Sequence, residues 1–287
     1  MGATMDRIMV DGVELEYDSR GSGEAVVLIH GAGFADSFLP LAVEPALRNH
    51  YRMIRYRRRG HGGSTQIDGA VSIAEHAHDC GALLGALDVK QAHVVGNSYG
   101  ACIALQLAVD SPDLVSSLAL FEPLLLAVPS AQKVFDAMGP IVEKYVAGDR
   151  AGAVDDVFSF LDGSDWREEV SRTVPGGPEQ AKDDVATLFE SDLPSLQEWR
   201  FGAEEAAQIK QPVLFLFGNE SQPFFIEGRD LVHSWLPHTE DDVMPGANHL
   251  LHMRHPADAA ARLADFLKRH SVVDQGTYDP ANTFQLN

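Results

Sequence analysis

Short apolar segments alternate along this chain with segments of helical periodicity, and the alternation restricts the fold more than any other feature. The apolar segments lie at residues 25–31, 51–60, 91–100, 115–123 and 212–218. The first of them is apolar almost throughout, which is typical of a strand in a sheet covered on both faces. Strands that alternate with helices favour parallel pairing. We therefore predict an α/β fold with a mostly parallel central sheet.

The alternation is interrupted once. Residues 124–208 contain no convincing strand and are typical of several short helices divided by glycine-rich turns. The sequence therefore predicts a core of residues 1–123 and 209–270 with a helical cap at 124–208 inserted into it. The tail at 271–287 has no period. We expect it either to be disordered or to pack as an arm on a neighbouring chain, which leaves a homodimer open.

Composition limits the partners of the protein. The 287 residues carry a formal net charge of −20, and an acidic surface repels nucleic acids and anionic membranes. No apolar run reaches the roughly 18–20 residues of a membrane span. The two cysteines, Cys80 and Cys102, do not form a CxxC motif, and no secretory leader is evident near Met1. We therefore expect a reduced, cytoplasmic protein that binds neither membrane nor nucleic acid.

A candidate nucleophile lies where an apolar strand is predicted to turn into a helix. Gly96-Asn97-Ser98-Tyr99-Gly100 is a GxSxG motif between "AHVV" and "ACIALQLAV". In this setting the serine occupies a sharp turn that exposes its hydroxyl above the sheet, and the flanking glycines allow close backbone approach. The N-terminus of the following helix favours developing negative charge. Ser98 is therefore predicted to be a catalytic nucleophile.

The glycine-rich turn "HGAG" at 30–33 follows an earlier predicted strand. Acyl transfer requires preorganised N–H groups that bind an oxyanion. We expect one donor to be the backbone N–H of Tyr99, directly after the nucleophile. For the second donor we expect the backbone N–H of Ala32 as first choice and that of Gly31 as second choice. The sequence alone does not distinguish between these two residues.

Three histidines in "PGANHLLHMRHP" compete for the role of base. Only His249 directly follows the glycine turn, where a loop can present it over the sheet. A neutral imidazole suits proton abstraction from a serine near neutral pH. No His, Asp or Glu set has a recognisable ligand spacing, so no metal and no other cofactor is expected.

Four motifs in combination resemble those of the α/β-hydrolase superfamily: HGAG at 30–33, RRRGHGGS at 57–64, GNSYG at 96–100 and PGANH at 245–249. The resemblance covers essentially the whole chain, and the helical segment falls where that superfamily inserts its cap. It implies a catalytic serine, acid and histidine in this order along the chain. It identifies the fold much more specifically than the substrate.

The position of the acid departs from the usual pattern of that superfamily. A typical member has G-x-x-D after the strand that corresponds to 212–218, but here the fourth residue is Ser221. Two replacements are available: Glu122, at the end of the preceding strand, and Glu220, one residue early. Haloalkane dehalogenases and zearalenone-type lactone hydrolases are similar in placing the acid after the earlier strand. We predict Glu122, with Glu220 as the alternative and a dyad or another acid remaining open.

Arginines after a predicted strand and apolar side chains of the cap are further candidates for substrate contact. Arg55 and Arg57 to Arg59 could bind an anion, but similar RGxGxS turns brace the sheet in the resembling superfamily, so we expect a structural role. Trp199 in the cap and Leu124 at its entry are predicted to line an apolar pocket.

The sequence therefore predicts a serine hydrolase that cleaves an apolar carboxylic ester or lactone through an acyl-serine. Two alternatives remain open. One is hydrolysis of a carbon–carbon bond in a diketone. The other is a non-catalytic binding or receptor protein of the same fold, because such a protein can keep the serine and histidine while its acid changes.

Overall fold

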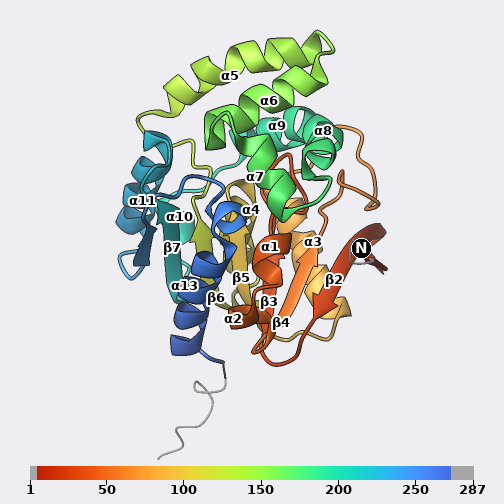
Figure 1. Cartoon of the computed structure of the whole chain (residues 1–287). Coiled ribbons are helices and arrows are strands. Elements are labelled where there is room, and N and C mark those ends of the chain that lie inside the picture. The colour runs from red at the N-terminus through yellow and green to blue at the C-terminus, as the bar shows by residue number, and fades with distance from the viewer. Residues whose placement is uncertain (1–4, 273–287) are drawn as a thin grey trace, which may run out of the picture.

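The computed structural model describes residues 5–272, and its central eight-stranded sheet confirms the predicted α/β fold (Figure 1). The strand order is β1-β2-β4-β3-β5-β6-β7-β8. Only β2 runs against its neighbours β1 and β4, and all other pairs are parallel. The strands are β1 (Asp6–Val10), β2 (Val13–Arg20), β3 (Ala25–Ile29), β4 (Arg52–Tyr56), β5 (Ala92–Asn97), β6 (Val115–Phe121), β7 (Val213–Gly218) and β8 (Glu240–Met244).

Helices cover both faces of the sheet, which explains the continuously apolar strands. In β3, Val27 and Ile29 face one apolar core, while Val26 and Leu28 face the other. This is the two-residue alternation of a strand with no solvent face. The first core is covered by α3 (Ile73–Ala86), α4 (Tyr99–Asp110), α10 (Ala203–Ala206) and α11 (Pro223–Trp235), and the second by α1 (Leu39–Ala42), α2 (Pro45–Arg48), α12 (Leu251–Arg254) and α13 (Pro256–Arg269).

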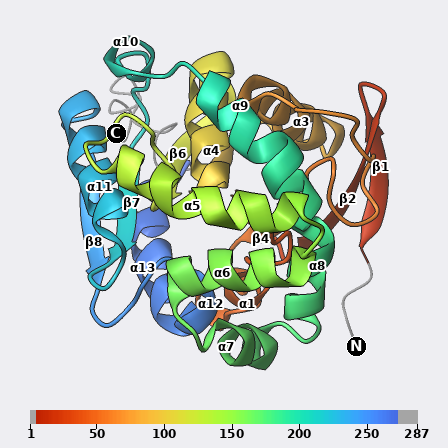
Figure 2. The ribbon, with the colours of Figure 1, turned by 90° about the horizontal axis from the view of Figure 1, so that it is seen from above.

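Between β6 and β7 the chain forms a layer of helices over one end of the sheet (Figures 1 and 2). It falls in the segment 124–208, for which we keep the name cap. Apolar side chains of the cap pack together with Phe34, Leu250 and Met253 of the core in one cluster, in which the rings of Phe158 and Trp166 stack at 4.7 Å. The cap helices over the end of the sheet are α5 (Ala131–Val146), α6 (Arg150–Asp162), α7 (Trp166–Thr173), α8 (Gly177–Thr187), the π-helical turn η2 (Leu188–Asp192) and α9 (Leu193–Glu198). The helix α10 also falls in this segment but packs on the first core.

The predictions about the C-terminal tail and about membrane spans can be compared with the structure only within the described residues. Of the tail predicted at 271–287, residues 273–287 lie outside the described part of the chain. Among the helices of residues 5–272, none combines the length and the apolar character that a bilayer crossing requires.

A buried carboxylate joins the cap to the loop after β3. The backbone N–H of Ala35 donates to Asp184 Oδ2 at 2.9 Å, and Asp184 is only 3% exposed. Burial raises the pKa of Asp184 from 3.8 to about 6, although the hydrogen bond from Ala35 opposes the rise. Between about pH 4 and pH 6 the folded chain therefore keeps a proton on Asp184 that the unfolded chain has already lost.

We expect Asp184→Asn to remove a pH dependence of stability. Because the folded pKa lies above the unfolded one, the stabilisation is complete below about pH 4 and lost as pH rises through about 6. The variant should be more stable than the wild type by about 1–3 kcal/mol at pH 7 and equal to it near pH 4. Urea unfolding across this range measures the difference. Asp183→Asn, an exposed change on the same helix, is the control. A difference between Asp184→Asn and wild type that does not vary with pH would contradict the expectation.

Candidate active site

Ser98 occupies the tight turn between β5 and α4. Its backbone angles are φ 54° and ψ −118°, a conformation that non-glycine residues rarely adopt. A Cβ on Gly100 would lie 2.1 Å from the carbonyl oxygen of Ile29, and one on Gly96 would lie 2.3 Å from the carbonyl oxygen of Gly100. The two glycines of the motif are therefore required by the packing of α4 against the sheet, and this packing holds the strained serine in place.

Glu122 and His249 form a buried pair beside this turn. Glu122 directly follows β6, at the same end of the sheet as Ser98, and its φ is also positive at 48°. Its Oε2 lies 2.8 Å from His249 Nδ1, and the exposed fractions of the two residues are 0% and 2%. Because a carboxylate only accepts hydrogen bonds, Nδ1 carries the proton and Nε2 is left as an acceptor. This is the tautomer that a histidine needs to act as a base towards a serine.

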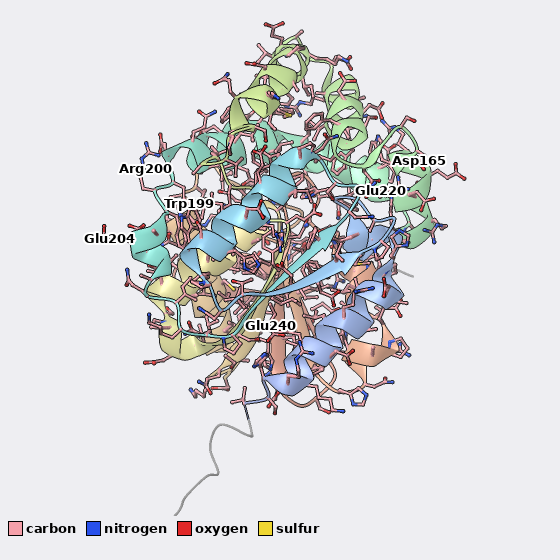
Figure 3. All side chains as sticks on the ribbon, turned by 90° about the vertical axis from the view of Figure 1, so that its left-hand side faces the viewer. Asp165, Trp199, Arg200, Glu204, Glu220 and Glu240 are labelled. Carbon is pink, nitrogen blue, oxygen red and sulfur yellow. The ribbon has the colours of Figure 1, made fainter. Side chains whose placement is uncertain are left out.

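Ser221, at the position where an acid was expected, is a hydrogen-bond partner of Glu122. Its hydroxyl donates to Glu122 Oε1 at 2.6 Å, and the backbone N–H of Gly218 donates to the same oxygen at 2.8 Å. Both carboxylate oxygens are therefore bonded, and three donors hold a charge that is completely buried. Glu220, labelled in Figure 3, has an exposed side chain after β7. The structure thus brings Glu122, and not Glu220, to His249.

The other two histidines of the same loop lie elsewhere. His252 is completely buried among apolar side chains, and its ring lies 4.6 Å from that of Phe38. Burial lowers the pKa of His252 to about 3, so it stays neutral. His255 is exposed before α13.

Phe225 is a site residue that the sequence only hinted at. Its ring stacks on His249 with the centroids 3.9 Å apart and the planes 12° from parallel. Pro223 starts α11, so Phe224 and Phe225 fall in its first turn and both line the cavity. The adjacent phenylalanines of "QPFF" were the available signal, because two aromatic residues at a strand end have little reason to be solvent-exposed. The stacked ring restricts how His249 can turn.

Ser98 and His249 line one cavity of about 90 Å³ between the cap and the sheet. Gly31, Ala32 and Leu124 also line it, and a Cβ on Gly31 would lie 3.3 Å from Ser98 Cβ. The side chain of Tyr99 is completely buried and does not line the cavity. Tyr99 is the first residue of α4, so it can offer the site only its backbone N–H. The remaining wall is almost entirely apolar and includes Phe34, Met138, Val157, Phe158, Leu188 and Leu193.

Trp199 lies outside this cavity, contrary to the expectation from the sequence. It follows the last residue of α9 with an extended backbone (φ −65°, ψ 130°), which takes the chain away from the cap interior. Its ring stacks on Phe201 at 4.9 Å, and its indole N–H donates to Gln106 of α4 at 2.8 Å. Figure 3 shows it beside Arg200 at the edge of the molecule. Trp199 therefore braces the cap against the core.

Within residues 5–272, no three His, Cys, Asp or Glu side chains gather in a way that could hold a metal ion. The candidate catalytic groups are Ser98, His249 and Glu122, together with backbone N–H groups of two turns.

The chain belongs to the α/β-hydrolase fold family, whose model matches residues 24–256. Among curated proteins it resembles the uncharacterized hydrolase YraK of Bacillus subtilis (strain 168), with 38% identity over 123 residues. That match covers 42% of this chain and 44% of YraK, so the chain spans less than half the length of this relative.

Solved structures share the fold over nearly the whole chain. One is Est816, described as an N-acyl homoserine lactone degrading enzyme, with 23% identity, a TM-score of 0.71, and coverage of 91% of this chain and 100% of Est816. Another is naproxen esterase (carboxylesterase NP) from Bacillus subtilis, with 19% identity, a TM-score of 0.75, and coverage of 92% and 91%. At these identities the likeness concerns the fold alone.

Proposed function

We propose that the protein is a serine hydrolase that cleaves a carboxylic ester or lactone of a largely apolar small molecule. The observation that carries the proposal is the buried Glu122–His249 pair, which lies at the same cavity as Ser98 on its strained turn. Serine, base and orienting carboxylate make up the group of residues that acyl transfer requires.

In the proposed reaction, Ser98 Oγ attacks the acyl carbonyl while His249 Nε2 takes the hydroxyl proton. The resulting oxyanion accepts hydrogen bonds from the backbone N–H of Tyr99 and from that of Ala32 or Gly31. His249 then gives its proton to the leaving alkoxide, and an acyl-serine remains. A water molecule, deprotonated by His249, attacks the acyl-serine, and the carboxylic acid leaves as the Ser98 hydroxyl is restored. The carboxylate of Glu122 accepts the hydrogen bond from Nδ1–H and stabilises the imidazolium in both steps.

The apolar wall of the cavity supports an apolar substrate. Phe158, Leu188 and Leu193 from the cap face the nucleophile side of the core across this space. Burial of apolar substrate area here contributes roughly 25 cal/mol per Å² removed from water. The side chains of Ser37, Asn97 and Gln222 are polar groups of the lining that could orient the substrate.

Fluorophosphonate labelling combined with a substrate panel tests the proposal. The panel contains p-nitrophenyl esters, linear esters, lactones and a diketone that is cleaved at a carbon–carbon bond, and Ser98→Ala provides the blank. We expect labelling at Ser98 and turnover of esters or lactones by the wild type only. Turnover of the diketone alone would favour a carbon–carbon hydrolase. Neither labelling nor turnover would favour a non-catalytic binding protein and refute the proposal.

A further inference from the structure

A completely buried ion pair links the cap to the core next to the candidate active site. Arg58, in the loop after β4, bonds both carboxylate oxygens of Asp192, the last residue of η2. The distances are 2.9 Å from Nη1 to Oδ1 and 2.8 Å from Nη2 to Oδ2, and neither side chain is exposed. A buried pair of this kind seldom adds net stability over apolar residues of the same volume, because desolvation offsets the attraction. Its presence calls for another explanation.

The guanidinium of Arg58 contacts both turns from which we expect the oxyanion donors to come. Its Nη2 also donates to the carbonyl oxygen of Gly31 at 3.1 Å. Its central carbon lies 4.8 Å from the centre of the Tyr99 ring, within the range of a cation–π contact. One side chain therefore contacts the loop after β3 and the start of α4 together.

The same carbonyl has a second donor in His30. The backbone N–H of Arg58 donates to His30 Nε2 at 3.1 Å, so the proton of this histidine lies on Nδ1. That Nδ1 lies 2.7 Å from the carbonyl oxygen of Gly31. Burial, with the adjacent charge of Arg58, holds the pKa of His30 well below its usual range, so the ring stays neutral. Arg58 Nη2 and His30 Nδ1 thus both donate to the carbonyl oxygen of Gly31 and hold the Gly31–Ala32 peptide group.

Holding this carbonyl also fixes the direction of the next N–H. In a trans peptide the C=O of Gly31 and the N–H of Ala32 point in opposite directions. The carbonyl points to the buried Arg58, whereas Gly31 and Ala32 both line the cavity that contains Ser98. The N–H of Ala32 is therefore directed away from Arg58, on the side where an oxyanion on Ser98 would form.

Asp192 ties this arrangement to the wall of the cavity. It ends a π-helical turn, and short π-helical insertions are frequent at functional sites. Leu188, at the start of the turn, and Leu193, directly after Asp192, both line the cavity. The cap segment that would contact an apolar substrate is thus the one that holds Arg58.

We propose that Arg58 and Asp192 are positioning residues of the oxyanion site: the cap carboxylate orients Arg58, and Arg58 fixes the Gly31–Ala32 peptide so that the Ala32 N–H meets the oxyanion. This inference rests on the proposed function. It assigns Ala32 rather than Gly31 as the second donor, and it gives the arginine-rich turn a role in the reaction in addition to bracing the sheet.

The test replaces the whole pair by apolar side chains, Arg58→Met with Asp192→Leu, so that no unpaired charge is left buried. The matched control is Arg59→Met with Asp79→Leu. This neighbouring pair is also bidentate, at 2.7 and 2.6 Å, but Arg59 bonds Asp79 and not Gly31. Active sites are counted by fluorophosphonate titration, so that kcat refers to folded protein only. Affinity for a trifluoromethyl ketone, which forms an oxyanion on the serine, is compared with affinity for the product acid.

We expect the Arg58/Asp192 variant to lose about 10- to 100-fold in kcat, less than the loss of a whole oxyanion donor. Its KM should change by less than about threefold. Affinity for the trifluoromethyl ketone should fall by the same factor as kcat/KM, while affinity for the product acid stays near that of wild type. The Arg59/Asp79 variant should keep wild-type values per active site.

A kcat per active site equal to that of the control, with unchanged trifluoromethyl ketone affinity, would overturn the inference. If the double variant does not fold, Arg58→Lys replaces it. The lysine can still pair with Asp192 but lacks the planar fork that reaches Gly31 as well, so the same losses are expected. A wild type without turnover that depends on Ser98 would instead refute the proposed function, which separates the two failures.

Discussion

Glu122→Gln is expected to lower kcat by about 10³- to 10⁴-fold with little change in KM. The reason lies in the donors around the carboxylate. Ser221 and Gly218 both donate to Oε1, so the amide oxygen of a glutamine would take that place and its NH₂ group would face His249. His249 Nδ1 would then have to accept, and the proton would move to Nε2. In that tautomer the ring cannot take the proton of Ser98.

Steady-state kinetics with an ester found active in the substrate panel measures this effect, with active sites titrated as above. The matched control is Glu220→Gln, which removes the same charge two residues beyond β7 on an exposed side chain. It should keep kcat within about twofold of wild type, as exposed changes away from a site usually do. A Glu122→Gln variant with near-normal turnover beside an inactive Glu220→Gln variant would show that the acid is misassigned.

Gly100→Ala is expected to destabilise the fold by about 3 kcal/mol or more. The added Cβ would lie 2.1 Å from the carbonyl oxygen of Ile29 and 2.6 Å from that of His30. Both obstacles are backbone atoms at the end of a central strand, so no side-chain rotation can relieve the clash. The helix α4 would have to move away from β3, and the turn that holds Ser98 would move with it.

Urea unfolding, followed by circular dichroism, measures the loss, and Gly85→Ala is its control. Gly85 is an exposed residue of α3, and a Cβ there would meet nothing within 4 Å. That substitution should stabilise the chain by about 0.5–1 kcal/mol, because alanine is the better helix former. If Gly100→Ala unfolded at the same urea concentration as wild type, the packing of α4 on the sheet would not be the reason for this glycine.

The local parts of the site could be predicted because neighbouring residues determine them. A strand, a glycine-flanked serine and a helix follow one another within residues 92–110, so a local motif was enough to predict Ser98 as the candidate nucleophile. His249 was distinguished from His252 and His255 by its place directly after a glycine turn. The alternation of strands with helices and the expectation of a helical segment at 124–208 followed from periodicity in the same way.

Side chains that meet from distant segments were harder to predict. Glu122 could be proposed because it ends a strand, but its choice over Glu220 depended on a resemblance. The structure gives two physical reasons. Glu122 is completely buried, whereas Glu220 is exposed. Ser221 donates a hydrogen bond to Glu122 from the usual position of the acid, where a second carboxylate would repel Glu122. Trp199 was expected in the pocket because aromatic residues in a cap often line one. Its direction depends on how α9 ends, which no local pattern reveals.

The amino-acid sequence by itself predicted which segments form strands, where helices interrupt them, the serine turn and the loop that carries His249, since each follows from residues that are close together in the chain. Only the tertiary structure decided which carboxylate meets His249, 127 residues away, and which residue of the cap pairs with Arg58, 134 residues away. Such pairs have no sequence signature of their own. They form because the carboxyl ends of parallel strands meet at one edge of the sheet, and because the cap closes over that edge.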